Sequence, residues 1–309
     1  MRYSLLRWRR LHGRQEPDFP VPFVVGATRS GTTLLRLMLD AHPDLAIPYE
    51  THFIPDVIDR CEKGSVDPEI LTRVITRHKR WHDLRLEREE LEDRLEQLHP
   101  LNAADAIRTV YRLYAEKQGK PRWGDKTPGY VKEMRRIQRV LPEARFVHIV
   151  RDGRDVALSL LSRSFGPTTV EEAAKLWRNR IRKARRQAPE LRHYMEIHYE
   201  DLILDTEGSL RRICEFAGLE FDPVMLDYHE RAQERLEERN RMAAKGRERK
   251  NPPKLKGHQL AMQPPREDQI GKWRSTMSAE DVASYEAVAG EVLAELGYDV
   301  THQPAAATR

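Results

Sequence analysis

The amino-acid sequence predicts an α/β fold, in which a central parallel sheet is flanked by helices. Apolar runs typical of strands alternate with helical patterns, so crossovers must join successive strands, which then pair in parallel. The first run also leads directly into a polar loop bracketed by glycines, and then into a helix. We expect a sheet buried on both faces, built from the runs Val21–Val25, Leu45–Ile47, Phe146–Val150 and Tyr194–Tyr199.

Helical periodicity marks the segments between and beyond these runs. The pattern at Val170–Gln187 places Ala173, Leu176 and Trp177 on one stripe, with arginines elsewhere. Gly218 is expected to end the last predicted helix in a left-handed C-cap. The predicted helices are Leu84–Leu98, Ala103–Gln118, Val170–Gln187 and Glu207–Ala217.

The loop after the first predicted strand has the features of an anion-binding site. Gly26 and Gly31 have the spacing of the P-loop pattern G-x-x-x-x-G-K-[ST], whose backbone N–H groups surround a phosphate at a helix N-terminus. Thr32 occupies the position of the lysine, which argues against nucleoside-triphosphate chemistry. Arg29 supplies a guanidinium suited to a phosphate or sulfate. The candidate anion-binding residues are Arg29, Ser30, Gly31, Thr32 and Thr33.

A second segment also has the features of a phosphate-binding site. The apolar run that starts at Phe146 ends at Arg151, a turn follows at Asp152-Gly153, and helix-forming residues carry Ser159 about two turns further on. Arg151 and Ser159 are therefore expected to converge on one phosphate outside the carboxyl edge of the sheet.

These two elements resemble those of sulfotransferases that use 3′-phosphoadenosine-5′-phosphosulfate (PAPS). Gly-Ala-Thr-Arg-Ser-Gly-Thr-Thr-Leu-Leu at 26–35, followed by Asp-Ala-His-Pro-Asp at 40–44, is similar to their 5′-phosphosulfate loop, and residues 145–159 are similar to their 3′-phosphate element. The residues of these motifs are closest to those of tyrosylprotein and carbohydrate (heparan-type) sulfotransferases. The resemblance implies a P-loop-like fold, PAPS as donor, adenosine 3′,5′-bisphosphate as product, and no metal.

The resemblance also implies catalytic residues. Glu50 matches the glutamate that serves as base in the tyrosylprotein and heparan-type enzymes, and Lys126, in Asp-Lys-Thr-Pro, matches the lysine that contacts the transferring group. A carboxylate can accept the acceptor's proton, while an ammonium offsets charge on the leaving oxygen. His52 is the alternative base, because its ordinary pKa lies near neutrality. Arg29 is a further catalytic candidate.

Two later segments complete the predicted cofactor site. Gln-Ile-Gly-Lys-Trp-Arg at 269–274 resembles the family's late cofactor segment, so Lys272, Trp273 and Arg274 are expected near the 3′-phosphate or the adenine. The alternative to a cofactor contact is that Trp273 packs the terminal helix against the core. Tyr199, in Tyr-Glu-Asp-Leu, matches a tyrosine that approaches the adenosine in the family.

The chain divides into an arm, one domain and a tail. Residues 1–20 form a basic N-terminal arm, 21–300 the domain, and 301–309 the C-terminal tail. Residues 231–256 are dense in Glu, Arg and Lys, which predicts a mobile loop or frayed helix that serves as a lid or merely as a linker.

Composition limits the compartment and the partners. The chain of 309 residues has a net charge of +5, which suits an anionic cofactor without requiring nucleic acid. No apolar run approaches the length of a membrane span, and Cys61 and Cys214 lack a disulfide or zinc spacing, so we expect a cytoplasmic protein without a metal site.

The sequence thus predicts a sulfotransferase that moves a sulfuryl group from PAPS to a hydroxyl acceptor by in-line displacement. A P-loop nucleotide kinase and a non-catalytic nucleotide-binding protein are the alternatives. The acceptor can be a small molecule, a carbohydrate, a lipid or a tyrosine, and the acceptor class and oligomeric state stay open at this point.

Overall fold

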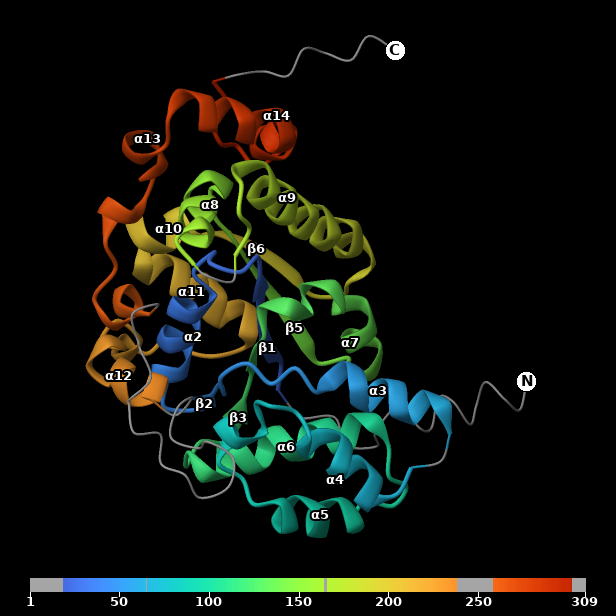
Figure 1. Ribbon diagram of the computed structural model, residues 1–309. Coiled ribbons are helices and arrows are strands. Elements are labelled where there is room, and N and C mark those ends of the chain that lie inside the picture. The colour runs from blue at the N-terminus through green and yellow to red at the C-terminus, as the bar shows by residue number, and fades with distance from the viewer. Residues whose placement is uncertain (1–18, 65, 164–165, 238–257, 302–309) are drawn as a thin grey trace, which may run out of the picture.

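A four-stranded parallel sheet forms the centre of the molecule (Figure 1). The computed structural model describes residues 19–64, 66–163, 166–237 and 258–301. The strand order is β4-β1-β5-β6, and each neighbouring pair is parallel, so the fold class predicted from the sequence is confirmed. The strands are β1 (Val21–Gly26), β4 (Asp125–Lys126), β5 (Ala144–Val150) and β6 (Tyr194–His198).

Helices cover both faces of this sheet. Val21, Phe23 and Val25 of β1 point into one hydrophobic cluster, while Val24 joins Val147 in a second cluster on the opposite face. All five side chains are fully buried, so the central strands are enclosed on both faces as predicted. A third cluster joins α8, α9 and α14 beyond the carboxyl ends of the strands.

The helices occupy the following ranges. They are α2 (Thr32–Ala41), α3 (Ile54–Lys63), α4 (Pro68–Thr76), α5 (Arg88–Glu96), α6 (Ala103–Lys117), α7 (Met134–Val140), α8 (Gly153–Leu161), α9 (Val170–Gln187), α10 (Tyr199–Leu204), α11 (Thr206–Ala217), α12 (His229–Glu237), α13 (Trp273–Thr276) and α14 (Ala279–Glu295). No helix in the described part of the chain is long and apolar enough to span a membrane.

Most predicted helices form close to their expected bounds. The helix predicted at Val170–Gln187 is α9, and Gly218 ends α11 in the left-handed region with φ of 60°. The prediction of one helix over Leu84–Leu98 was wrong, because a short 3₁₀ turn ends at Leu84 and Arg85 adopts a left-handed conformation. The α-helix begins only at Arg88.

One predicted strand lies outside the central sheet. β2 (Leu45–Ala46) pairs in parallel with β3 (Arg122–Trp123) in a separate two-stranded sheet. The chain then crosses from β3 to β4 through Gly124, where an added Cβ would lie 2.9 Å from the carbonyl oxygen of Pro22. A glycine is therefore needed for β4 to approach β1.

The charged segment at 231–256 is helical where it is described. Residues 231–237 belong to α12, and Arg235 Nε donates to Asp40 Oδ2 at 2.6 Å, both side chains being buried. This part is therefore a packed helix rather than a mobile loop, because Arg235, Ala232 and Leu236 place it against the core. The remainder of the predicted lid or linker lies outside the described residues, as do most of the arm and the tail.

Candidate active site

The strand-to-helix loop after β1 has the geometry of an anion cradle. Arg29 and Gly31 have φ of 74° and 98°, so the backbone turns through the left-handed region twice. A Cβ on Gly31 would lie 2.5 Å from the ring of Tyr199, which only glycine avoids. α2 then starts at Thr32 with neither a side-chain cap nor an acidic residue in its first turn. Its first N–H groups and the positive end of its dipole are therefore available to an anion.

The ends of all four parallel strands meet at one cavity. The cavity has a volume of about 370 Å³ and lies where the loop after β1 faces residues that follow β4, β5 and β6. Pro128 follows β4, Arg151 follows β5 and Tyr199 follows β6, whereas Lys126 at the end of β4 is fully buried and does not line the cavity. Its lining includes Thr28, Arg29, Gly31, Thr32, Thr33, Tyr49, Glu50, His52, Arg80, Arg151, Arg180 and Tyr199. The structure thus brings most of the predicted site residues to one place.

Glu50 contacts two of the other catalytic candidates, Lys126 and His52. Its Oε1 accepts a hydrogen bond from Lys126 Nζ at 3.1 Å, and its Oε2 lies 3.1 Å from His52 Nε2. Lys126 is fully buried and its ammonium lies 4.1 Å from the centre of the Tyr49 ring. His52 adopts a left-handed conformation with φ of 63°, which turns its side chain back toward Glu50.

The charges of this cluster are mutually stabilised. Burial alone favours the neutral acid of Glu50, but the attraction of Lys126 and the hydrogen bonds from His52 and Lys126 outweigh it and lower the pKa of Glu50. Burial lowers the pKa of Lys126, and Glu50 opposes that shift. The cluster therefore holds a carboxylate at neutral pH, as a base requires.

A buried carboxylate beneath this cluster was missed from the sequence. Asp125 Oδ2 accepts hydrogen bonds from Thr51 Oγ1 at 3.0 Å, Tyr111 OH at 2.8 Å and Thr127 Oγ1 at 3.1 Å. Thr51 N also donates to Thr127 Oγ1 at 3.0 Å. Because Thr51 lies between Glu50 and His52 in the chain, these bonds fix the segment that carries both candidate bases. The only sequence signal was that Asp125 precedes Lys126.

Three arginines surround the predicted 3′-phosphate position. Arg29 Nε donates to Ser159 Oγ at 2.8 Å, and the Arg151 guanidinium lies 4.2 Å from the centre of the Tyr199 ring. The pKa of Arg29 is lowered by burial and by the positive charges of Arg163 and Arg151. Arg163, four residues after Ser159, was not predicted. An anion at this point would relieve the repulsion between the arginines.

Three buried polar atoms at the site have no hydrogen-bond partner. Ser30 Oγ, Arg151 Nε and Arg163 Nε are all buried without a hydrogen bond in the described part of the chain. Buried donors are normally satisfied, so unpaired ones beside an anion cradle fit a site that is completed by a bound anionic ligand.

The segment at 269–274 has a different environment from the other predicted cofactor-binding residues. Trp273 is buried, its Nε1 donates to Asp152 Oδ2 at 3.0 Å, and the Arg154 guanidinium lies 3.6 Å from the centre of its ring. This environment favours the alternative in which Trp273 docks the C-terminal helices. Lys272 and Arg274 are exposed, and Arg274 pairs with Asp299, so neither lines the cavity.

The fold and this site define an α/β transferase with a P-loop-like cradle. Comparison with known proteins narrows the class. Residues 20–223 match a family model described as "Sulfotransferase family". The chain is 28% identical over 224 residues to the protein-tyrosine sulfotransferase of Drosophila melanogaster, covering 69% of this chain and 41% of that protein. It is 26% identical over 292 residues to protein-tyrosine sulfotransferase A of Caenorhabditis elegans, covering 92% of this chain and 69% of that protein.

A solved structure supports the same fold. The sulfotransferase domain of the Synechococcus PCC 7002 olefin synthase superposes with a TM-score of 0.60 at 24% identity, over 92% of this chain and 98% of that domain. The chain belongs to the sulfotransferase family. The resemblance inferred from the two loops is thereby confirmed, and the kinase alternative is not better supported.

Proposed function

We propose that this chain transfers a sulfuryl group from PAPS to a hydroxyl acceptor and releases adenosine 3′,5′-bisphosphate. The observation that carries this proposal is the placement of the lysine-free anion cradle and of Glu50, which accepts a hydrogen bond from the buried Lys126, on one cavity. The donor carries charge at both its 5′ and 3′ ends. The loop at Gly26–Thr33 suits the 5′ end, and Arg29, Arg151, Ser159 and Arg163 suit the 3′-phosphate.

The proposed mechanism is a single in-line displacement. PAPS supplies an electrophilic sulfur, and the acceptor oxygen forms the new S–O bond as the bond to the phosphate oxygen breaks. Glu50 accepts the proton of the acceptor hydroxyl, while Lys126 and Arg29 offset the negative charge that develops on the departing phosphate oxygen. His52 is the alternative proton acceptor and otherwise orients Glu50 through their hydrogen bond.

Phenolic hydroxyls, including that of tyrosine, are the proposed acceptor class. The support is that the relatives from Drosophila melanogaster and Caenorhabditis elegans are named protein-tyrosine sulfotransferases. This chain spans 41% of the length of the first of them, so the acceptor is proposed for this domain only. A cytoplasmic location and the absence of a metal requirement also stay predictions.

Calorimetry and a transfer assay test the proposal together. Adenosine 3′,5′-bisphosphate should bind without magnesium and raise the melting temperature, because it binds the folded state only. ATP should bind more weakly, because the cradle lacks the P-loop lysine. Transfer of ³⁵S from labelled PAPS to 4-methylphenol should be detectable with EDTA present. Equal affinity for ATP, or transfer that needs magnesium, would contradict the proposal.

A further inference from the structure

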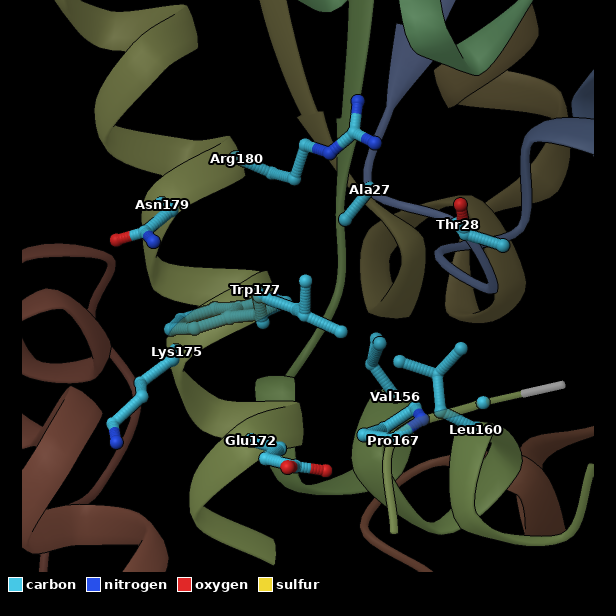
Figure 2. Close-up of a pocket in the computed structure, with 12 residues that line it drawn as sticks. Ala27, Thr28, Val156, Leu160, Pro167, Glu172, Lys175, Trp177, Asn179 and Arg180 are labelled. Carbon is cyan, nitrogen blue, oxygen red and sulfur yellow. The ribbon is translucent and has the colours of Figure 1, made fainter. Parts of the chain in front are cut away.

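A second cavity lies directly beside the active-site cavity. It has a volume of about 630 Å³, within the range of sites that hold small molecules. The two cavities share Thr28 and Arg180 in their linings. Thr28 belongs to the anion cradle and Arg180 to α9, so the second cavity opens beside the loop that is proposed to hold the transferring group (Figure 2).

The walls of this second cavity are mainly apolar. Trp177 of α9 lines the cavity together with Val156 and Leu160, which lie one turn apart on α8, and all three belong to one hydrophobic cluster (Figure 2). In the same view the polar ends of Lys175 and Asn179 point away from Leu160. The apolar side chains of the lining are therefore suited to hydrocarbon, and the charged side chains of Glu172, Lys175 and Arg180 supply part of the rest of the lining.

Trp177 is fixed in the wall of the cavity, and a leucine at the edge of the cavity is exposed. Trp177 is 1% exposed, and its Nε1 donates to the carbonyl oxygen of Arg151 at 3.1 Å. Leu176, which directly precedes Trp177 on α9, is 51% exposed although it lines the cavity. An exposed leucine at the edge of an apolar cavity extends the surface that an apolar ligand can cover.

The donor is a poor occupant for this cavity. PAPS is a polyanion, and the arginines matched to its charges, Arg29, Arg151 and Arg163, do not line the second cavity. An acceptor is the better occupant, because the cavity that Glu50 lines adjoins the apolar space at Thr28 and Arg180.

We propose that the cavity beside Trp177 binds the apolar part of the acceptor, so that the preferred acceptors are hydroxyl compounds that carry an alkyl or aryl group. This inference rests on the proposed function, since it assigns the rest of the acceptor whose hydroxyl receives the sulfuryl group. Each methylene that enters the cavity should raise affinity about fourfold, the equivalent of about 0.8 kcal/mol per buried methylene.

A series of 4-alkylphenols from methyl to octyl tests the inference by direct binding. Calorimetric titration is carried out on the full chain saturated with adenosine 3′,5′-bisphosphate, so no turnover is needed. Affinity should rise with alkyl length until the cavity is filled. Leu176→Glu should reduce the octyl-to-methyl affinity ratio at least tenfold, because a carboxylate at the rim must lose water when the chain enters.

Leu204→Glu is the matched control. Leu204 is 61% exposed on α10 and lines neither cavity, so its substitution should leave the affinity ratio unchanged. Leu160→Trp, which fills the cavity from α8, should shift the preferred chain to shorter lengths. It provides a second test if Leu176→Glu does not fold.

The outcomes separate this inference from the proposed function. An affinity that does not depend on alkyl length, or the same ratio in Leu176→Glu and Leu204→Glu, would overturn the apolar subsite even if sulfuryl transfer is observed. Such a result is also expected if another part of this chain fills the cavity. Failure to bind adenosine 3′,5′-bisphosphate, or failure to transfer to any phenol, would instead remove the proposed function.

Discussion

Lys126 Nζ donates a hydrogen bond to Glu50 Oε1 at 3.1 Å from a side chain with no solvent exposure. Each of these two groups keeps the other charged: the lysine lowers the pKa of the glutamate, and the glutamate limits the fall in the pKa of the buried lysine. Without a ligand, the site therefore holds a carboxylate and an ammonium group whose opposite charges offset each other. Negative charge that develops on a departing oxygen would draw Lys126 from Glu50 and make the carboxylate more basic as the proton transfers.

Glu50→Gln should slow sulfuryl transfer on the order of 10²–10⁴-fold, the usual contribution of a general base. Affinity for adenosine 3′,5′-bisphosphate should change much less, because the proton moves only in the chemical step. The rates are measured under single-turnover conditions with saturating PAPS. His52→Ala is compared in parallel: if it abolishes transfer while Glu50→Gln retains nearly full rate, the base is His52.

Arg151→Ala and Arg163→Ala should each weaken binding of adenosine 3′,5′-bisphosphate by about 1.5–3 kcal/mol, the range for hydrogen bonds to charged groups. The reason is that both guanidinium groups lie near Arg29, where their repulsion is relieved by an anion. Calorimetric titration measures the change. Arg211→Ala serves as control, since Arg211 is exposed on α11 and pairs with Glu207. Unchanged affinity in both test variants would place the 3′-phosphate elsewhere.

The central sheet and the anion cradle could be predicted because both have local sequence signals. Buried strands such as β1 and β5 are continuous apolar runs, and Gly26 and Gly31 punctuate the loop. Lys126 was placed by resemblance, whereas β3 and β4, of two residues each, are too short to show a pattern. Arg163 and Asp125 act through contacts with residues far away in the chain, which no spacing encodes.

The same limit applies to the charged segment, whose described part forms the packed helix α12. Its composition indicates a solvated stretch, but Arg235 pairs with Asp40, which lies 195 positions earlier in the chain. Arg235 Nη2 also donates to Tyr114 OH at 2.8 Å, so a single arginine joins α12, α2 and α6. Local composition cannot reveal such a partner.

Arg235→Ala should lower the free energy of unfolding by about 3–5 kcal/mol, because it leaves Asp40 buried without its main counter-charge. Urea unfolding monitored by circular dichroism measures the change. Arg231→Ala on the same helix is the control: its guanidinium and its partner Glu234 are both 65% exposed, so the change should stay within about 0.5 kcal/mol. Equal effects would mean that α12 does not depend on the buried pair.

Asp125→Asn should alter the pH dependence of stability in a defined direction. Burial raises the pKa of Asp125 from the ordinary 3.8 to about 6, although hydrogen bonds from Tyr111, Thr51 and Thr127 oppose the shift. Because the folded-state pKa is raised, the stabilising contribution of the protonated acid is complete below pH 4 and is lost as pH rises through 6. A shift of this size corresponds to about 3 kcal/mol.

The free energy of unfolding of the wild type, minus that of Asp125→Asn, should therefore fall by about 2.4 kcal/mol between pH 4 and pH 7, because part of the effect has already been lost at pH 4. Urea titrations at several pH values measure this difference, and the asparagine retains an oxygen that can accept from the three hydroxyl groups. Asp201→Asn, at an exposed position of α10, is the control and should show no such trend. A difference that stays constant with pH would mean that Asp125 titrates normally, and its buried hydroxyl cluster would then be fully compatible with a carboxylate.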